Sequence, residues 1–245
     1  SYSSTSTIDE RGNVFSSVFV DDEDYDGIAD YTRRSSFIYD DKKTLTSSSI
    51  QTDEDGDGSV DNNSTTMYSY NSSYKLVEKF SEYDSDNNGS IDSTIRRTQT
   101  YDLNGNKISL HVQYDNDADG IIDKINSTTQ EYNAANKLTL HRFVTDSTND
   151  GIVDSITTNT YSYNSLNQVT QSVYERDTDA DATPDFRAIT QTICDANNNV
   201  VGSSYAEESA ADGTITYFKN IASTFNSYNQ VAERTESRDT NGDGT

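Results

Sequence analysis

Apolar and polar residues alternate over short segments along much of the chain. In residues 107–114 the apolar side chains stand at every second position, from Ile108 to Tyr114. Residues 124–133 and 155–164 are rich in Thr, Ser, Tyr and Ile. A period of two and a high content of β-branched side chains are typical of strands, and no apolar stripe of helical period accompanies them. The pattern predicts an all-β chain.

Short segments rich in Asn, Asp and Gly separate the predicted strands. Examples are YNAANK at 132–137, YNSLNQ at 163–168 and YDLNGNK at 101–107. Such residues favour tight turns because their side chains bond to the nearby backbone and they tolerate positive φ. In the segment 101–107 the next aliphatic residue, Ile108, stands one position later than in other copies. We therefore expect a turn one residue longer there, followed by a strand one residue shorter.

An acidic segment recurs with a fixed period of 31 residues. Its copies begin at Asp22, Asp53, Asp84, Asp115, Asp146, Asp177, Glu208 (a decayed copy) and Asp239 (a shortened copy). A second landmark stands 17 residues after each of the first seven starts, at Tyr39, Tyr70, Tyr101, Tyr132, Tyr163, Cys194 and Phe225. Asp or Asn follows that landmark each time. Each unit is therefore predicted to contain an acidic loop, a strand, a short turn and a second strand.

The fixed period predicts one continuous repeat array over residues 1–245. The whole repeats are 22–52, 53–83, 84–114, 115–145, 146–176, 177–207 and 208–238, between partial repeats at 1–21 and 239–245. Two geometries fit. The hairpin-like turns favour an elongated, curled antiparallel meander, whereas the unbroken period also suits a β-solenoid with parallel, in-register strands. Both geometries place the acidic loops along one edge.

Composition shows that apolar burial is not the main source of stability. Hydrophobic residues make up 31% of the chain and Trp is absent, against roughly 45–50% apolar residues in ordinary domains. So little apolar area cannot offset the entropy lost on ordering the backbone. The formal net charge of -24 argues against nucleic acid as a partner, since phosphates need a basic surface. No apolar run approaches the roughly 18 residues of a membrane span, so we expect no membrane insertion.

The acidic segments follow the pattern D-x-D-x-D-G-x-x-D. Oxygen ligands at positions one, three and five, a Gly at six, a carbonyl at seven and a carboxylate at nine suit Ca²⁺, a hard cation that prefers oxygen. We predict about one Ca²⁺ in each intact loop. The predicted ligands are Asp22, Asp24, Asp26, Ile28, Asp30, Asp53, Asp55, Asp57, Ser59, Asp61, Asp84, Asp86, Asn88, Ser90, Asp92, Asp115, Asp117, Asp119, Ile121, Asp123, Asp146, Thr148, Asp150, Ile152, Asp154, Asp177, Asp179, Asp181, Thr183, Asp185, Asp239, Asn241, Asp243 and Thr245.

The loops are unequal as ligand sets. The first, second and fourth are complete, whereas the third has Asn88 at position five and the fifth has Thr148 at position three. The sixth has Ala182 in place of the Gly, which predicts a strained turn. The seventh offers only Glu208 and Asp212, so we expect it to be empty or weak.

The loop resembles the first half of an EF-hand, but position twelve lacks the bidentate Glu of that motif. It is more similar to the calcium loops of thrombospondin type-three repeats and of integrin-type FG-GAP hairpins. The turn half, Y-[DN]-x-x-x-[NK], resembles the YD repeats of bacterial RHS-type surface proteins. These resemblances imply a calcium-loop β repeat from a bacterial extracellular adhesin or surface fibre.

Shape and metal together predict a calcium-stabilised structural or adhesive protein at the cell surface. The alternative is a carbohydrate- or protein-binding module that uses the column of tyrosines as an aromatic strip. No catalytic spacing is present, so we do not expect an enzyme. Cys194 is interpreted as a drifted Tyr, and His111 and His141 as a surface pair. Both ends cut through a repeat, which predicts further repeats in the same chain or end-to-end contact between copies of a filament.

Overall fold

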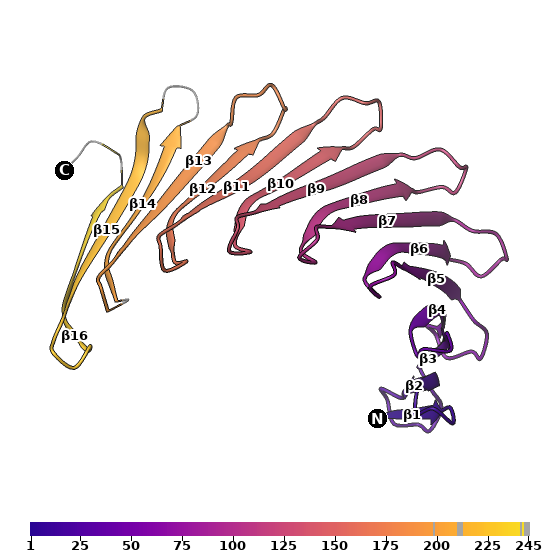
Figure 1. Cartoon of the computed structure of the whole chain (residues 1–245). Helices are drawn as coiled ribbons and strands as arrows, with labels where there is room; N and C mark the ends of the chain where they lie inside the picture. Colours follow the sequence, from indigo (N-terminus) through magenta and orange to yellow (C-terminus); the bar gives the residue numbers. More distant parts are fainter. Residues whose placement is uncertain (198, 210–212, 241, 243–245) are drawn as a thin grey trace. The chain divides into compact units, whose positions relative to one another are not determined.

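A computed structural model of the chain describes residues 1–197, 199–209, 213–240 and 242 (Figure 1). Every regular element within these residues is a β-strand. The strands are β1 (Tyr2–Ile8), β2 (Val14–Asp21), β3 (Tyr31–Tyr39), β4 (Leu45–Asp53), β5 (Asn62–Tyr70), β6 (Leu76–Asp84), β7 (Ser93–Tyr101), β8 (Lys107–Asp115), β9 (Lys124–Tyr132), β10 (Leu138–Asp146), β11 (Ser155–Tyr163), β12 (Val169–Asp177), β13 (Phe186–Cys194), β14 (Val200–Ser209), β15 (Ile215–Phe225) and β16 (Val231–Asp239). No helix in the described residues is long and apolar enough to cross a membrane.

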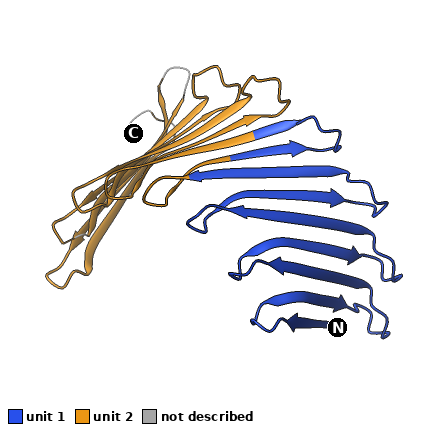
Figure 2. Ribbon diagram, turned by 45° about the vertical axis from the view of Figure 1, so that its right-hand side comes forward, with its two compact units in different colours: residues 1–100, 111–125 blue, residues 101–110, 126–245 orange. Residues whose placement is uncertain are grey.

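The strands follow one another in the sheet in the order of the sequence. They fall into two compact units, one of residues 1–100 with 111–125 and the other of residues 101–110 with 126–245 (Figure 2). In the first unit β1 to β7 pair antiparallel with their neighbours, and in the second β10 to β16 do the same. The all-β antiparallel meander is confirmed. The β-solenoid alternative is wrong for these strands, because it requires parallel pairing.

Apolar burial is small, as the composition predicts. Val112 and Ala188 are the only buried apolar side chains among the described residues. The most deeply buried side chain is polar: Ser81 has no exposed surface, and its hydroxyl lies 3.0 Å from the hydroxyl of Thr66 on the neighbouring strand. Backbone ladders and polar cross-strand pairs therefore supply much of the order within each unit.

The short turns share one hairpin geometry. In the first turn, Gly12 N–H donates to the Asp9 carbonyl at 2.9 Å and Asp9 N–H donates to the Asn13 carbonyl at 2.8 Å. Gly12 has a φ of 83°, and the β1–β2 register shifts just before the turn. These features describe a tight turn followed by a bulge residue in the left-handed region.

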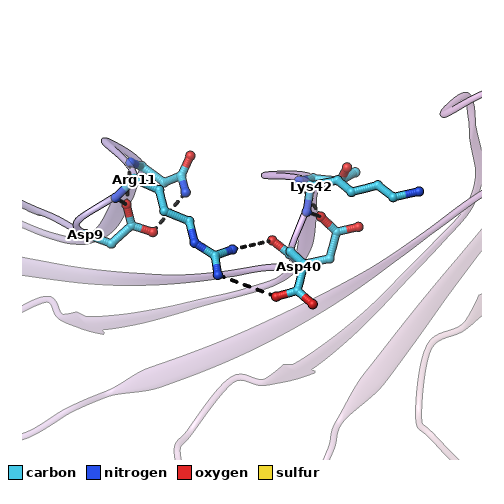
Figure 3. Close-up of polar contacts among 7 residues, drawn as sticks. Asp9, Arg11, Asp40 and Lys42 are labelled. Atoms are coloured by element: carbon cyan, nitrogen blue, oxygen red, sulfur yellow. Dashed lines mark hydrogen bonds and ion pairs between the residues drawn. The ribbon is translucent and has the colours of Figure 1, made fainter.

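An Asp or Asn begins every short turn because its side-chain oxygen is a required acceptor. Oδ1 of Asp9 accepts from the N–H groups of Arg11 and Asn13 at 2.9 and 2.8 Å. The N–H four residues later bonds in the same way to Asp40, Asn71, Asp102, Asn133, Asn164, Asp195 and Asn226. Figure 3 shows two consecutive turns, with Arg11 extending to the Asp40 carbonyl at 3.5 Å.

The turn at 101–107 does not have the extra residue expected from the sequence. Asp102 N–H donates to the Asn106 carbonyl at 2.9 Å and Gly105 N–H to the Asp102 carbonyl at 3.0 Å, as in the other turns. β8 also has the 9 residues of β6. The expectation was wrong because Lys107 occupies the usual aliphatic position at the start of the strand.

The tyrosines near the short turns connect neighbouring strands. Tyr163 Oη donates to the Leu138 carbonyl at 2.7 Å, and Tyr39 Oη donates to the Val14 carbonyl at 3.0 Å. Each carbonyl belongs to the first residue of the preceding strand. Cys194 stands at the same repeat position, and its Sγ accepts from Gln168 Nε2 at 3.4 Å. This column therefore links the strands at their turn ends.

Candidate metal loops

The acidic loops occupy the strand ends opposite the short turns within each unit (Figure 2). We number them one to six at residues 22–30, 53–61, 84–92, 115–123, 146–154 and 177–185, with positions one to nine in each. Loop seven begins at Glu208, and loop eight begins at Asp239. Loops one to four belong to the first unit and the others to the second.

Loop four illustrates the common backbone. Positions four and six, Ala118 and Gly120, have φ values of 54° and 86°. Position four is left-handed in all six loops, at Tyr25, Gly56, Asn87, Ala118, Asn149 and Ala180. Alternating right- and left-handed residues turn successive N–H groups toward the same side and so curl the loop around its acidic side chains. The sequence did not reveal position four, because most of its residues are not Gly.

Carboxylates at positions one, five and nine hold this curl by accepting backbone N–H groups. In loop four Asp115 Oδ2 accepts from Gly120 at 3.1 Å and Asp119 Oδ1 accepts from Ile121 at 2.7 Å. Asp123 Oδ2 accepts from Asn116 at 2.6 Å. The bond from position two to position nine recurs in all six loops. Each of these acids has a second oxygen that the bond does not use.

The position-one carboxylates are buried at the base of the loops. Their exposed fractions are 2% for Asp53, 4% for Asp84, 5% for Asp115 and Asp177, and 9% for Asp146. Oδ1 of Asp115, Asp146 and Asp177, and Oδ1 of the part-buried Asp22, are inaccessible and have no hydrogen-bond partner. An ionised oxygen buried without a partner costs several kcal/mol. Four repeats therefore have the same unsatisfied acceptor at the same place.

Other carboxylates converge on this buried acid. In loops one, three, four and six, positions one, three and nine each place an oxygen within 4.8 Å of the others, from Asp22, Asp24 and Asp30; Asp84, Asp86 and Asp92; Asp115, Asp117 and Asp123; and Asp177, Asp179 and Asp185. In loop two the cluster comes from Asp53, Asp55 and Asp57. Oxygens at this spacing can share one Ca²⁺, whose ligands lie about 2.3–2.6 Å from the ion.

Position five has a second role that the sequence did not indicate. Its side-chain oxygen accepts the N–H of position seven in all six loops, at Asp26, Asp57, Asn88, Asp119, Asp150 and Asp181. This bond holds the N-terminal side of the residue whose carbonyl is the predicted ligand, which is Ile28, Ser59, Ser90, Ile121, Ile152 or Thr183. Outside loop two, position five is not part of the carboxylate clusters found among the described residues.

Consecutive loops of the first unit touch one another. Asn87, at position four of loop three, donates from Nδ2 to the carbonyl of Val60, at position eight of loop two, at 2.9 Å. Gly56, at position four of loop two, is so close to loop one that a Cβ there would lie 1.9 Å from the Ala29 carbonyl oxygen. Position four of one loop therefore packs against position eight of the preceding loop, and this contact holds the two loops together.

Loop five lacks the carboxylate cluster of the other loops, whereas loop six has the cluster but lacks the glycine. Loop five keeps the buried acid Asp146 and its partnerless oxygen, but Thr148 replaces the acid at position three and no carboxylate cluster is found there among the described residues. Loop six has the cluster, but Ala182 takes a φ of 74° at the glycine position. The hydroxyl of Thr178, and then its N–H, donate to Asp185 and lower the pKa of that carboxyl below its ordinary value.

The last two loops contribute less to the candidate site. In loop seven Glu208 forms an ion pair with Arg187 at 2.7 Å, and Asp212 lies outside the described residues. In loop eight Gly242 N–H donates to Asp239 Oδ1 at 2.8 Å, while the predicted ligands Asn241, Asp243 and Thr245 lie outside the described residues.

Comparison with known proteins identifies no family. No family model matches the chain, and no curated protein sequence is significantly similar to it. Among solved structures, a TcdB2–TccC3 crystal structure matches 90% of this chain and 18% of its own, at 10% identity and a TM-score of 0.25. A porin-like protein from Bacteroides uniformis matches over 89% and 92%, at 12% identity and a TM-score of 0.29. A Photorhabdus luminescens Tc holotoxin pore matches over 95% and 14%, at 13% identity and a TM-score of 0.25. At these scores the likeness is limited to β-rich structure, and no function is drawn from it.

Proposed function

We propose that this chain is a calcium-stabilised structural repeat protein of the cell exterior, with one Ca²⁺ in each of loops one to six. The observation that carries the proposal is the buried, partnerless Oδ1 at position one of four loops. A divalent cation at the carboxylate cluster gives that oxygen a partner and offsets the repulsion between neighbouring acids. Loops one, two and four, with complete ligand sets, bind most tightly.

Net charge supports a divalent partner. At -24 the chain repels itself, and that repulsion disfavours the compact state. Six Ca²⁺ ions would neutralise half of this charge. The low apolar burial also supports a bound cation, because the fold needs another source of stability. Each bound ion at 100-fold excess over its dissociation constant stabilises the folded state by about 2.7 kcal/mol. Calcium loops that bind at about 0.1–1 mM suit extracellular fluids, which favours a role outside the cell.

The contacts of the tyrosines near the short turns favour a structural or adhesive role over a binding role. The hydroxyls of Tyr39, Tyr132 and Tyr163 donate to backbone carbonyls, so these rings are already engaged between strands. This use leaves less of each ring for a sugar or a partner chain and argues against the aromatic-strip alternative. We infer that the chain serves as a structural segment of a surface fibre.

Calcium binding is tested directly on the whole chain. After exhaustive chelation and dialysis, calorimetry with CaCl₂ should give one ion for each of loops one to six, and thermal unfolding should show a large rise in midpoint. Asp115→Asn removes a charge from the buried position and should reduce the ion count by one. Asp195→Asn is the matched control, because Asn serves the same role in other short turns, and it should leave the count unchanged.

Two outcomes would refute the proposal. One is the absence of calcium binding at millimolar concentration together with an unchanged thermal midpoint after chelation. The other is an equal loss of ions in the Asp115 and Asp195 variants, which would mean that the acidic loops are not the sites. A parallel titration with MgCl₂ separates the two cations, because Mg²⁺ demands a tighter octahedral shell.

A further inference from the structure

Loop seven differs from the other loops at a position outside the acidic motif. The antiparallel register places one residue of the preceding strand directly opposite position one. That residue is Thr32 for loop two, Asn63 for loop three and Ile156 for loop six. For loop seven it is Arg187, opposite Glu208. Loop seven, whose acidic motif is incomplete, therefore has a basic residue opposite its position one.

Arg187 lies between two carboxylates on one face of the sheet. Its Nη1 is 2.7 Å from Oε2 of Glu208, and its Nε is 3.1 Å from Oε1 of Glu175. Glu175 faces Arg187 from the strand on the other side. The Glu208 side chain is 19% exposed and that of Arg187 is 39% exposed. A guanidinium is permanently charged and offers several donors, which suits it to two acids at once.

We propose that the guanidinium of Arg187 takes in loop seven the place that Ca²⁺ takes in loops one to six. This inference rests on the proposed calcium function. The comparison between loops six and seven carries it. In loop six the buried Asp177 has an oxygen without a partner, whereas in loop seven the acid at the same position has an internal cation. The acid at position one of loop seven therefore has a counter-charge without a metal ion.

The replacement of the metal ion by Arg187 accounts for the incomplete acidic motif of loop seven. With the position-one charge neutralised by Arg187, further acids at the loop have no cation to bind, and position nine is Thr216. Backbone bonds join the described residues on either side instead: Ser209 N–H donates to the Thr214 carbonyl and Gly213 N–H donates to the Ser209 carbonyl, both at 2.8 Å. Glu in place of Asp gives the longer side chain that meets the guanidinium.

The test uses the full chain in saturating CaCl₂ and two readouts. Calorimetry should give the same ion count for wild type and Glu208→Gln, and one ion fewer for Asp177→Asn. Hydrogen exchange of the Ser209 and Gly213 amides should become about tenfold faster in Arg187→Met, because a partly screened charge-assisted bond is lost. Arg187→Lys keeps the charge and should restore part of the protection.

Arg96→Met is the matched control. Arg96 also pairs with a glutamate, Glu78, at 2.9 Å, but it lies within β7 in the other unit. It should leave the Ser209 and Gly213 amides unchanged. A lower ion count in Glu208→Gln, or unchanged exchange in Arg187→Met, would overturn the inference. Absence of calcium binding in every loop would instead refute the proposed function, and it would do so whatever Arg187→Met does to loop seven.

Discussion

Replacing Ala182 with Gly should stabilise loop six. Ala182 has a φ of 74° at a position where the other loops have Gly, such as Gly120 with a φ of 86°. The alanine still makes the bond of its counterparts: its N–H donates to Asp177 Oδ2 at 3.1 Å, and Gly120 N–H donates to Asp115 Oδ2 at the same distance. The loop therefore keeps its shape, and the alanine bears the conformational cost.

The size of the effect follows from two opposing terms. A non-Gly residue in the left-handed region costs about 1–2 kcal/mol. Glycine gives back about 0.4–1 kcal/mol, because it makes the unfolded chain more flexible. A Cβ built at Gly120 or Gly151 meets no atom within 4 Å, so we expect little packing to be lost with the alanine methyl. The net gain should be about 0.5–1 kcal/mol, or roughly 1–4 °C in thermal midpoint for a chain of this size.

Thermal unfolding in saturating Ca²⁺ measures this gain, with two control variants. Gly120→Ala introduces the same strain in loop four and should destabilise by about 0.5–1 kcal/mol. Gly202→Ala should show no such loss, because Gly202 has no positive φ and a Cβ there makes an ordinary contact with Ile193 at 3.5 Å. The reasoning is refuted if Ala182→Gly lowers the midpoint, or if Gly120→Ala and Gly202→Ala have equal effects.

Two further predictions concern the short turns. Tyr163→Phe removes the hydroxyl that donates to the Leu138 carbonyl at 2.7 Å, so urea unfolding should show a loss of about 0.5–1.5 kcal/mol; unchanged stability would mean that the ring alone matters. The amide of Asn106 donates to Asp102 and lowers its pKa below the ordinary value, so this carboxylate stabilises the turn above the unfolded pKa of about 3.9 and the effect is lost as pH falls through the lower folded pKa. Amide protection factors, which are corrected for the intrinsic exchange rate at each pH, should therefore fall from pH 5 to pH 2 in this turn and not in the turn that begins at Asn164, which has no carboxylate; equal falls would contradict it.

The repeat and its two edges were predictable from the sequence because each position has a strict local requirement. A short turn needs a side-chain acceptor at its first residue, and Asp or Asn, as at Asp9 and Asn71, supplies a stronger one than Ser or Thr. The acidic loops likewise need carboxylates at fixed spacing. Such requirements repeat every 31 residues, and so they are visible in a single chain.

Three features of the structure were not predictable from the sequence. The turn at 101–107 has the common length because Lys107, although not aliphatic, is the first residue of β8. The left-handed residue at position four was missed because Tyr25 and Ala118 are not residues associated with positive φ. The Arg187–Glu208 pair depends on the register between β13 and β14, which the sequence spacing alone does not fix.

The two ends of the strands are stabilised differently within each unit. At the turn ends the side-chain oxygens of residues such as Asp9 and Asn133 are matched by backbone N–H groups, and the turns are complete without an ion. At the loop ends of loops four, five and six, a backbone donor satisfies one oxygen of the buried acid and the other, as at Asp115 and Asp177, has no partner. An unsatisfied buried charge destabilises the segment that holds it. Removal of calcium should therefore loosen the loop ends before the turn ends, and each unit should open from the loop ends of its strands.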